Sequence, residues 1–235
     1  MIPKLIHQTA KTADMPAECS QHVAKVKALH PEWEYRLWTD RDNLDFVARE
    51  FPDFLNIFNA LPRNIMRADV IRYLLMYRLG GFYLDTDYEM LKPFDLCEKD
   101  IVLCWEPNPI KPNENGKMAN AIFASSPGHP FFGMMIEELK INPPLSADAD
   151  VEDTTGPGLV TRVYEKAIKG GMSLFAATPE LFSPLTPRNE KEYRKIVQSG
   201  VAYGIHHCHG SWRNFTLRQQ LINFLSRIYY RANAS

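Results

Sequence analysis

Hydrophobic and polar positions follow two different periods along the first sixty residues. The apolar run at 3–10 ("PKLIHQTA") and the two-residue alternation at 32–40 ("EWEYRLWTD") predict two strands. Between them, residues 18–31 repeat apolar positions at helical spacing and stop at a proline, and 41–60 predicts two short helices. The first part of the chain therefore alternates strand and helix.

The clearest helical pattern follows at 65–79 ("IMRADVIRYLLMYRL"). Apolar residues recur there every three to four positions, and the glycine pair at 80–81 predicts the C-terminal cap. A strand, "FYLD" at 82–85, begins immediately afterwards. This alternation predicts an α/β fold with a Rossmann-like mixed sheet flanked by helices.

The second half of the chain has a less regular pattern. Strands are predicted at 100–106 and from 120, the latter followed by a turn and a helix that ends near 140. A polar loop is predicted at 109–119 and an acidic surface loop at 145–158. The remaining predicted elements are a helix at 159–169, a late strand from 201 that opens into a loop, and an amphipathic helix at 215–231.

The overall composition is that of an ordinary globular protein with a near-neutral charge balance. Of the 235 residues, 45% are hydrophobic, and the formal net charge is -1. This balance gives no general electrostatic reason to bind nucleic acid. Because no repeat or linker divides the sequence, we expect one domain over 1–235, with a nucleotide-binding half at 1–90 and an acceptor half at 91–235.

Segments that direct a chain into or across a membrane are not evident in the sequence. Residues 1–16 lack the apolar core of a secretory signal, and no stretch provides the roughly 20 apolar residues of a transmembrane helix. Four cysteines without a CxxC pair favour free thiols, so a cytoplasmic location is expected. The basic helix at 215–231 has two interpretations, which are packing against the domain and peripheral contact with a membrane surface.

Two aspartates follow the buried strand in "LGGFYLDTDYE". In an extended strand Tyr83, Asp85 and Asp87 share one face, with the carboxylates about 6–7 Å apart. Two negative charges beside an apolar core repel each other, and a divalent cation such as Mn²⁺ or Mg²⁺ resolves that conflict. The pair therefore indicates a metal site, although a DxD alone is also common at ordinary turns.

A second charged pair lies inside the preceding apolar helix. Asp69 and Arg72 are three residues apart and share a helical face. A buried charge is costly unless it is paired with an opposite charge or contacts a ligand. The two residues therefore form either a structural ion pair or part of a binding site.

The joint pattern at 67–87, "RADVIRYLLMYRLGGFYLDTD", resembles the signature of the DxD-containing glycosyltransferases of family 32. That family includes capsule-synthesis enzymes and fungal mannosyltransferases and is related to the large clostridial glucosylating toxins. "IPKLIHQT" at 2–9 resembles its opening strand, "TGPG" at 155–158 is also similar, and "YGIHHCHGSWRN" at 203–214 resembles its closing motif. The resemblance implies a GT-A fold, a nucleotide-sugar donor, a divalent metal, usually Mn²⁺, and retention of the anomeric configuration.

The same resemblance implies roles for individual residues. Asp87 would bind the metal, and Asp85 would hold the donor ribose or sugar and contact the metal directly or through water. Asp69 and Arg72 would bind hydroxyls of the transferred sugar and assist the leaving group. The other implied donor contacts are His7 and Gln8 near the base or ribose, Tyr83 beside the donor, and Ser211 and Trp212 over the diphosphate. A structural role for His7 stays equally open.

The closing motif contains three histidines, where the family pattern has two adjacent ones. His207 stands three residues before Gly210 and is the expected third metal ligand, since imidazole suits Mn²⁺ better than Mg²⁺. On a strand His209 shares its face and is the alternative. Asn120, which opens a later strand, is a further candidate for contact with the donor sugar.

Together these features predict a retaining, metal-dependent glycosyltransferase. It would move a hexose, from a UDP-sugar by preference, to a surface polysaccharide or to a glycolipid precursor. UDP-galactose, UDP-glucose and GDP-mannose all stay open as donors. The alternatives are a toxin-like transferase that modifies proteins and a nucleotide-sugar-binding module without catalysis.

Overall fold

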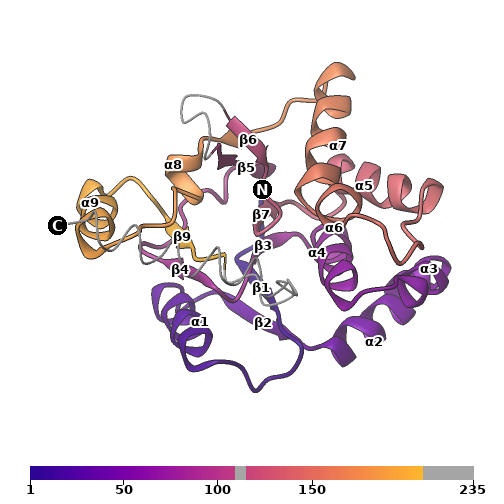
Figure 1. Ribbon diagram of the computed structural model, residues 1–235, viewed down its shortest axis with the longest axis horizontal. Helices are drawn as coiled ribbons and strands as arrows, with labels where there is room; N and C mark the ends of the chain where they lie inside the picture. The colour runs from indigo at the N-terminus through magenta and orange to yellow at the C-terminus, as the bar shows by residue number, and fades with distance from the viewer. Residues whose placement is uncertain (109–114, 209–235) are drawn as a thin grey trace.

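The computed structural model describes residues 1–108 and 115–208 of the chain. A mixed sheet lies at its centre, with helices on both sides (Figure 1). The spatial order of the strands is β2-β1-β3-β7-β5-β6, and β8 pairs with β5 off this path. The strands are β1 (Leu5–Thr9), β2 (Glu34–Trp38), β3 (Gly81–Leu84), β5 (Ile101–Pro107), β6 (Asn115–Met118), β7 (Ile122–Ser125) and β8 (Ala176–Ala177).

Strand direction changes at β3. Strand β1 runs parallel to both β2 and β3, whereas β7 runs antiparallel to β3 and to β5. The carboxyl ends of β1, β2 and β3 therefore meet at one edge of the sheet, where ligands bind in open α/β folds. The predicted α/β class, a mixed sheet flanked by helices, is confirmed.

Side-chain alternation along β3 divides the core into two layers. Tyr83 belongs to one apolar cluster, while Phe82 and Leu84 belong to the other. The first cluster takes its helical side chains from α2 (Asp40–Glu50), α3 (Leu55–Ala60), α4 (Asn64–Leu79), α5 (Pro130–Ile141), α6 (Val151–Thr154), α7 (Pro157–Lys169) and the 3-10 helix η1 (Pro52–Phe54). The second takes them from α1 (Ala17–Leu29) and α8 (Pro179–Phe182), together with β4 (Tyr88–Met90), which pairs with β9 (Gly204–His206).

The predicted glycine cap connects α4 directly to β3. Gly80 and Gly81 have φ values of 64° and 90°, in the left-handed region that glycine adopts without strain. A Cβ at Gly80 would lie 2.6 Å from the carbonyl oxygen of Ser125, and one at Gly81 would lie 2.5 Å from that of Leu5. This close passage between β1 and β7 sets the charged residues of α4 beside the end of β3.

Several short elements differ from the predicted pattern. The second part of the predicted polar loop at 109–119 is β6, an edge strand whose pairing with β5 outweighs its polar composition. The predicted acidic loop contains α6. Helix α9 (Glu190–Ser199) was not predicted, because every one of its residues keeps some solvent exposure and no buried stripe marks it in the sequence.

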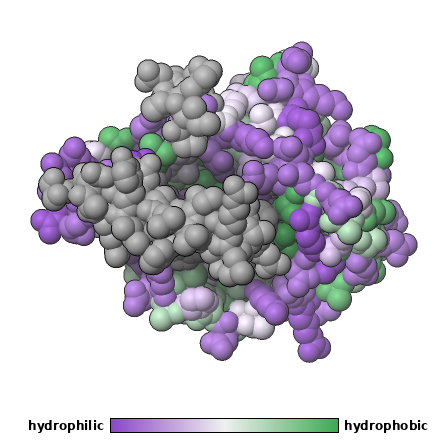
Figure 2. Space-filling model, in the orientation of Figure 1, coloured by the Kyte–Doolittle hydropathy of each residue, from purple (hydrophilic) through white to green (hydrophobic). Residues whose placement is uncertain are grey.

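Among the residues coloured in Figure 2, hydrophilic ones predominate on the face shown. Among the described residues, no helix has both the length and the apolar character needed to span a membrane. The predicted amphipathic helix at 215–231 lies outside the described residues.

Candidate active site

A cleft of about 890 Å³ opens at the carboxyl ends of β1 and β3. Residues from both expected halves line it, because β3 and β7 are adjacent in the sheet. Five predicted site residues lie on its wall, namely Asp69, Arg72, Asp85, Asp87 and Asn120. The cleft is large enough to hold a nucleotide-sized ligand.

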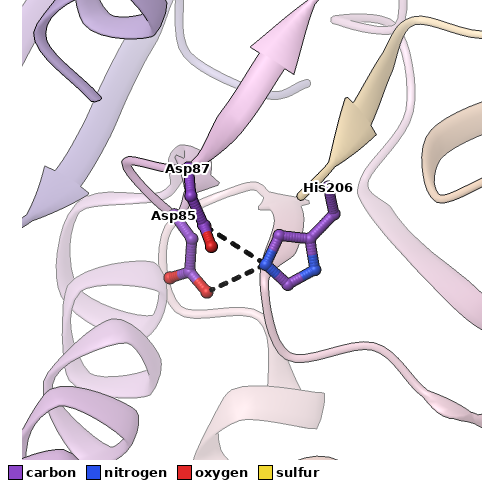
Figure 3. Close-up of side chains that lie close together, drawn as sticks. All are labelled: Asp85, Asp87 and His206. Carbon is purple, nitrogen blue, oxygen red and sulfur yellow. Dashed lines mark ion pairs between the residues drawn. The ribbon is translucent and has the colours of Figure 1, made fainter. Parts of the chain in front are cut away.

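The two aspartates of the DxD motif lie in a turn rather than in an extended strand. Strand β3 ends at Leu84, and the backbone N–H of Tyr88 donates to the carbonyl oxygen of Asp85 at 3.1 Å. The chain then continues as β4 and pairs with β9. The expected strand geometry of the pair is therefore wrong, yet both carboxylates converge on one imidazole (Figure 3).

Asp85, Asp87 and His206 form a candidate metal centre. Their ligand atoms all lie within 4.8 Å of one another. Nε2 of His206 is 3.2 Å from Oδ1 of Asp87 and 3.8 Å from Oδ2 of Asp85 (Figure 3). Two carboxylates and one imidazole are a donor set that suits Mn²⁺, so the residues fit the expected metal.

The charge state of His206 depends on this environment. Burial opposes the charged imidazole, but the hydrogen bonds with Asp87 and Cys208 and the charge of Asp87 raise the pKa of His206 well above its ordinary value. A proton and a metal ion therefore compete for the same ring nitrogen.

His206, not His207, faces the two aspartates, so the expected histidine must be corrected by one position. Adjacent residues of a strand point to opposite faces, and the pairing of Tyr88 with His206 sets which one faces the cleft. The imidazole of His207 lies 3.1 Å from Oε2 of Glu89 and stacks on His22. The alternative, His209, lies outside the described residues.

Arg72 joins the two carboxylates predicted to contact the sugar. Its guanidinium, 4% exposed, lies 3.3 Å from Oδ1 of Asp69 and 3.2 Å from Oδ1 of Asp85. It also donates to the carbonyl oxygen of Asn120 and lies over the ring of Tyr83. Burial opposes the positive charge, but the surrounding anions raise the pKa of Arg72, so the guanidinium stays charged.

Asp69 is held by hydrogen bonds from two side chains outside its own helix. Nδ2 of Asn120 donates to its Oδ1 at 2.9 Å, and the hydroxyl of Thr155 donates to its Oδ2 at 2.8 Å. Burial raises the pKa of Asp69 to about 6, although Arg72 and these hydrogen bonds favour the ionised form. Asn120 was expected at the site; Thr155 was not assigned a role, although it opens the "TGPG" motif.

Three predicted donor contacts lie beneath the cleft instead of in it. His7, Gln8 and Tyr83 are each 0% exposed. Burial lowers the pKa of His7 to about 4. Its neutral ring accepts from the indole N–H of Trp38 at 3.0 Å, so the other ring nitrogen donates to Gly80. The structural interpretation of His7 therefore fits.

Gln8 and Tyr83 hydrogen-bond Asp85 from the buried side of the cleft. The side-chain amide of Gln8 donates to the backbone oxygen of Asp85 at 3.0 Å, and the hydroxyl of Tyr83 donates to its Oδ1 at 2.8 Å. Thr9, which hydrogen-bonds the same tyrosine hydroxyl, is the residue of β1 that lines the cleft. Alternation along β1 cannot separate Thr9 from His7, because the two share one face of the strand. Thr9 lines the cleft because it is the last residue of β1, at the carboxyl end of the strand.

The predicted closing residues Ser211 and Trp212 lie outside the described residues. The described part of the late segment ends at Cys208, which lines the cleft beside His206. The site is thus assembled from β1, α4, the β3–β4 turn, Asn120 in the segment before β7, the α6–α7 junction and β9.

The fold is of the GT-A type that glycosyltransferases share. Residues 16–116 match the family described as the glycosyltransferase sugar-binding region containing a DXD motif, which confirms the predicted resemblance. The solved PaToxG glycosyltransferase shares the fold, with a TM-score of 0.56 and 17% identity over 86% of this chain and 89% of that one.

Two fungal mannosyltransferases are similar in sequence. The chain is 38% identical to inositol phosphoceramide mannosyltransferase 2 of Schizosaccharomyces pombe, over 60% of this chain and 39% of the relative. It is also 38% identical to mannosyl phosphorylinositol ceramide synthase CSH1 of Saccharomyces cerevisiae, over 60% of this chain and 36% of the relative. The chain therefore spans well under half the length of these two relatives.

Proposed function

We propose that this protein is a divalent-metal-dependent glycosyltransferase that moves mannose from a nucleotide-sugar to a glycolipid acceptor. The observation that carries the proposal is the convergence of Asp85, Asp87 and His206 beside the buried Asp69–Arg72 pair in one cleft. The similarity to glycolipid mannosyltransferases supports mannose and a lipid acceptor. It favours GDP-mannose over the UDP-sugars that the sequence analysis preferred.

Each part of the cleft has a chemical task in this proposal. Asp85, Asp87 and His206 would hold Mn²⁺, which would supply positive charge to the diphosphate leaving group. Asp69 accepts hydrogen bonds from sugar hydroxyls, and Arg72 adds a buried positive charge near the bond that breaks. The carboxylates of Asp69 and Asp85 are fixed by surrounding hydrogen bonds, so little reorganisation of these side chains is required when the donor binds.

Retention of the anomeric configuration forms part of the proposal. It rests on the resemblance to retaining DxD enzymes, and the product can test it directly. Proton NMR of the first-formed glycoside would show the same anomeric configuration as the donor. An inverted product would remove retention from the proposal and leave sugar transfer intact.

The donor and metal are tested together by a panel of nucleotide-sugars with Mn²⁺, Mg²⁺ or chelator. We expect GDP-mannose to be hydrolysed or transferred in the presence of Mn²⁺ and all turnover to stop with chelator. Asp87→Asn removes one proposed metal ligand with little change in volume and should reduce turnover at least 100-fold, since charge stabilisation of the leaving group is lost.

Glu106→Gln is the matched control, because it removes a carboxylate elsewhere on the cleft wall. It should leave metal dependence unchanged. Near-normal, Mn²⁺-dependent turnover by the Asp87→Asn protein would contradict the metal site. Turnover of a UDP-sugar with none of GDP-mannose would replace the proposed donor.

Two other functions predict different results in the same assay. A toxin-like transferase would label protein acceptors and not lipid acceptors. A binding module without catalysis would show Mn²⁺-dependent stabilisation by GDP or UDP and no hydrolysis or transfer.

A further inference from the structure

Thr155 is a fully buried polar residue at the junction of α6 and α7. Its hydroxyl donates to Oδ2 of Asp69 at 2.8 Å, and its backbone oxygen accepts from the hydroxyl of Tyr73. Asp69 and Tyr73 are four residues apart on α4. Helix α4 therefore holds Thr155 at two points, one through its side chain and one through its backbone.

The hydroxyl proton of Thr155 points to Asp69. The second oxygen near the hydroxyl is the carbonyl of Val151 at 3.3 Å. That carbonyl already accepts the N–H groups of Thr155 and Gly156, at 3.1 and 2.9 Å. A hydroxyl has one proton, and the nearer, ionised carboxylate is the stronger acceptor. The bond to Asp69 is therefore the one that Thr155 supplies.

Asp69 depends on this bond because it is buried. Burial raises the pKa of the carboxyl, whereas the charge of Arg72 and the hydrogen bonds from Thr155 and Asn120 lower it. Loss of the hydroxyl would leave Oδ2 without this donor, and the carboxylate would be held through Oδ1 alone, by Asn120 and Arg72. The charged or titratable groups that face Asp69 are Arg72, Asp85 and Tyr73.

The same junction forms part of the cleft wall. Wall residues flank Thr155 on both sides in the sequence, namely Val151, Glu152, Gly156 and Pro157. The junction is closely packed, since a Cβ at Gly158 would lie 2.8 Å from Cα of Asp153. A shift of Thr155 would therefore move the wall and the carboxylate together.

We propose that Thr155 is a positioning residue. Its hydroxyl fixes the orientation of the Asp69 carboxylate for donor-sugar binding and ties that carboxylate to the cleft wall at the α6–α7 junction. The role in sugar transfer rests on the proposed function, whereas the hydrogen bond to Asp69 does not. Two independent measurements test the role in sugar transfer and the hydrogen bond to Asp69 separately.

The kinetic readout uses Thr155→Val, which removes the hydroxyl and keeps the side-chain shape. We expect kcat/KM for the nucleotide-sugar to fall about 10- to 100-fold. The affinity for GDP with Mn²⁺ should stay within about twofold, because GDP lacks the sugar that Asp69 contacts. Thr155→Ser restores the hydroxyl and should recover kcat/KM to within about threefold of the wild type.

The second readout needs no catalysis. In protein with isotope-labelled aspartate, the side-chain carboxyl resonance of Asp69 is followed by NMR as the pH is changed. Thr155→Val should raise the pKa of Asp69 relative to the wild type, and Thr155→Ser should leave it nearly unchanged. The Asp87→Asn variant, measured in the same way, shows how much the pKa of Asp69 changes when only the proposed metal site is altered.

The outcomes divide clearly. An unchanged pKa of Asp69 in Thr155→Val, equal loss of GDP and nucleotide-sugar affinity, or no rescue by serine would overturn the proposal. A raised pKa in a protein whose wild type turns over no sugar donor would uphold the positioning of Asp69 and reject the proposed function. If Thr155→Val does not fold, Tyr73→Phe loosens the same junction and must lower kcat/KM with GDP affinity retained, or the proposal fails.

Discussion

His206 and His207 are neighbours in the chain but occupy different environments. The ring of His206 meets two carboxylates of the cleft, whereas that of His207 meets Glu89 and stacks on His22. His206→Ala should weaken Mn²⁺ binding at least about 10-fold, because it removes a proposed ligand. Isothermal titration with Mn²⁺ in the presence of GDP measures this effect.

His207→Ala is the matched comparison. It should leave Mn²⁺ affinity within about threefold and reduce the free energy of unfolding by about 1–2 kcal/mol, because Glu89 loses a partly buried hydrogen-bond partner. Weaker Mn²⁺ binding in His207→Ala than in His206→Ala would reverse the assignment of the two rings.

The sequence predicted which charged residues line the cleft, but it did not predict which histidine lies beside them. Asp69, Arg72, Asp85 and Asp87 lie on the cleft wall as expected, since charges inside an apolar helix or directly after a buried strand need a partner or a ligand. The predicted third ligand, His207, is one residue away from the histidine that faces the aspartates, because the register of β9 against β4 is a tertiary property. Sequence spacing alone cannot state which of two adjacent side chains faces a cleft.

At the scale of elements, the contact between β4 and β9 decides where His206 lies. A Cβ at Gly204 would lie 2.3 Å from Cε1 of Tyr88 and 2.5 Å from the backbone oxygen of Glu89. Gly204→Ala should therefore push β9 away from β4, lower the free energy of unfolding by about 1–3 kcal/mol and weaken Mn²⁺ binding. Urea unfolding and Mn²⁺ titration of the same preparation measure both effects.

Gly170→Ala provides the control for this substitution. Gly170 has a φ of -78°, and its added Cβ would meet neighbours at 3.4 Å, an ordinary contact. Stability and Mn²⁺ affinity should both stay close to the wild type. A Gly204→Ala protein that behaves like this control would show that β9 does not need the close approach.

Elements with a buried apolar stripe were predictable, and those held by tertiary pairing were not. Helix α4 and strands β1, β2 and β3 follow directly from periodicity and the glycine pair. Strand β6 is polar and depends on β5 for its hydrogen bonds, and α9 has no buried face. Their sequence patterns therefore resemble those of loops.

At the scale of the whole molecule, Glu89 joins segments that are far apart in the chain. Its carboxylate accepts from Lys25 of α1 at 3.0 Å and from Tyr193 of α9 at 2.8 Å, and it lies 3.1 Å from the ring of His207. The hydrogen bond with His207 is the main reason that the pKa of Glu89 falls from 4.5 to about 2. The carboxylate thus stabilises the packing of α1 and α9 against the β4–β9 pair.

This network predicts a pH dependence of stability. Because the pKa is lower in the folded protein, the contribution of Glu89 is complete above pH 4.5 and is lost as the pH falls towards 2. Glu89→Gln should cost up to about 3 kcal/mol at pH 7 and much less at pH 3. Urea unfolding of both proteins at the two pH values tests this, and a difference independent of pH would contradict it.

The position of β3 between β1 and β7 has a consequence for synthesis of the chain. Residues 1–90 contain β3 but lack β7, so β3 has a bare edge until residues 122–125 have been made. An apolar edge strand of this kind is a template for pairing with other chains. The nascent protein therefore exposes this edge to other chains from the synthesis of residue 90 until residue 125 is made, and a fragment of residues 1–90 expressed alone would keep that hazard permanently.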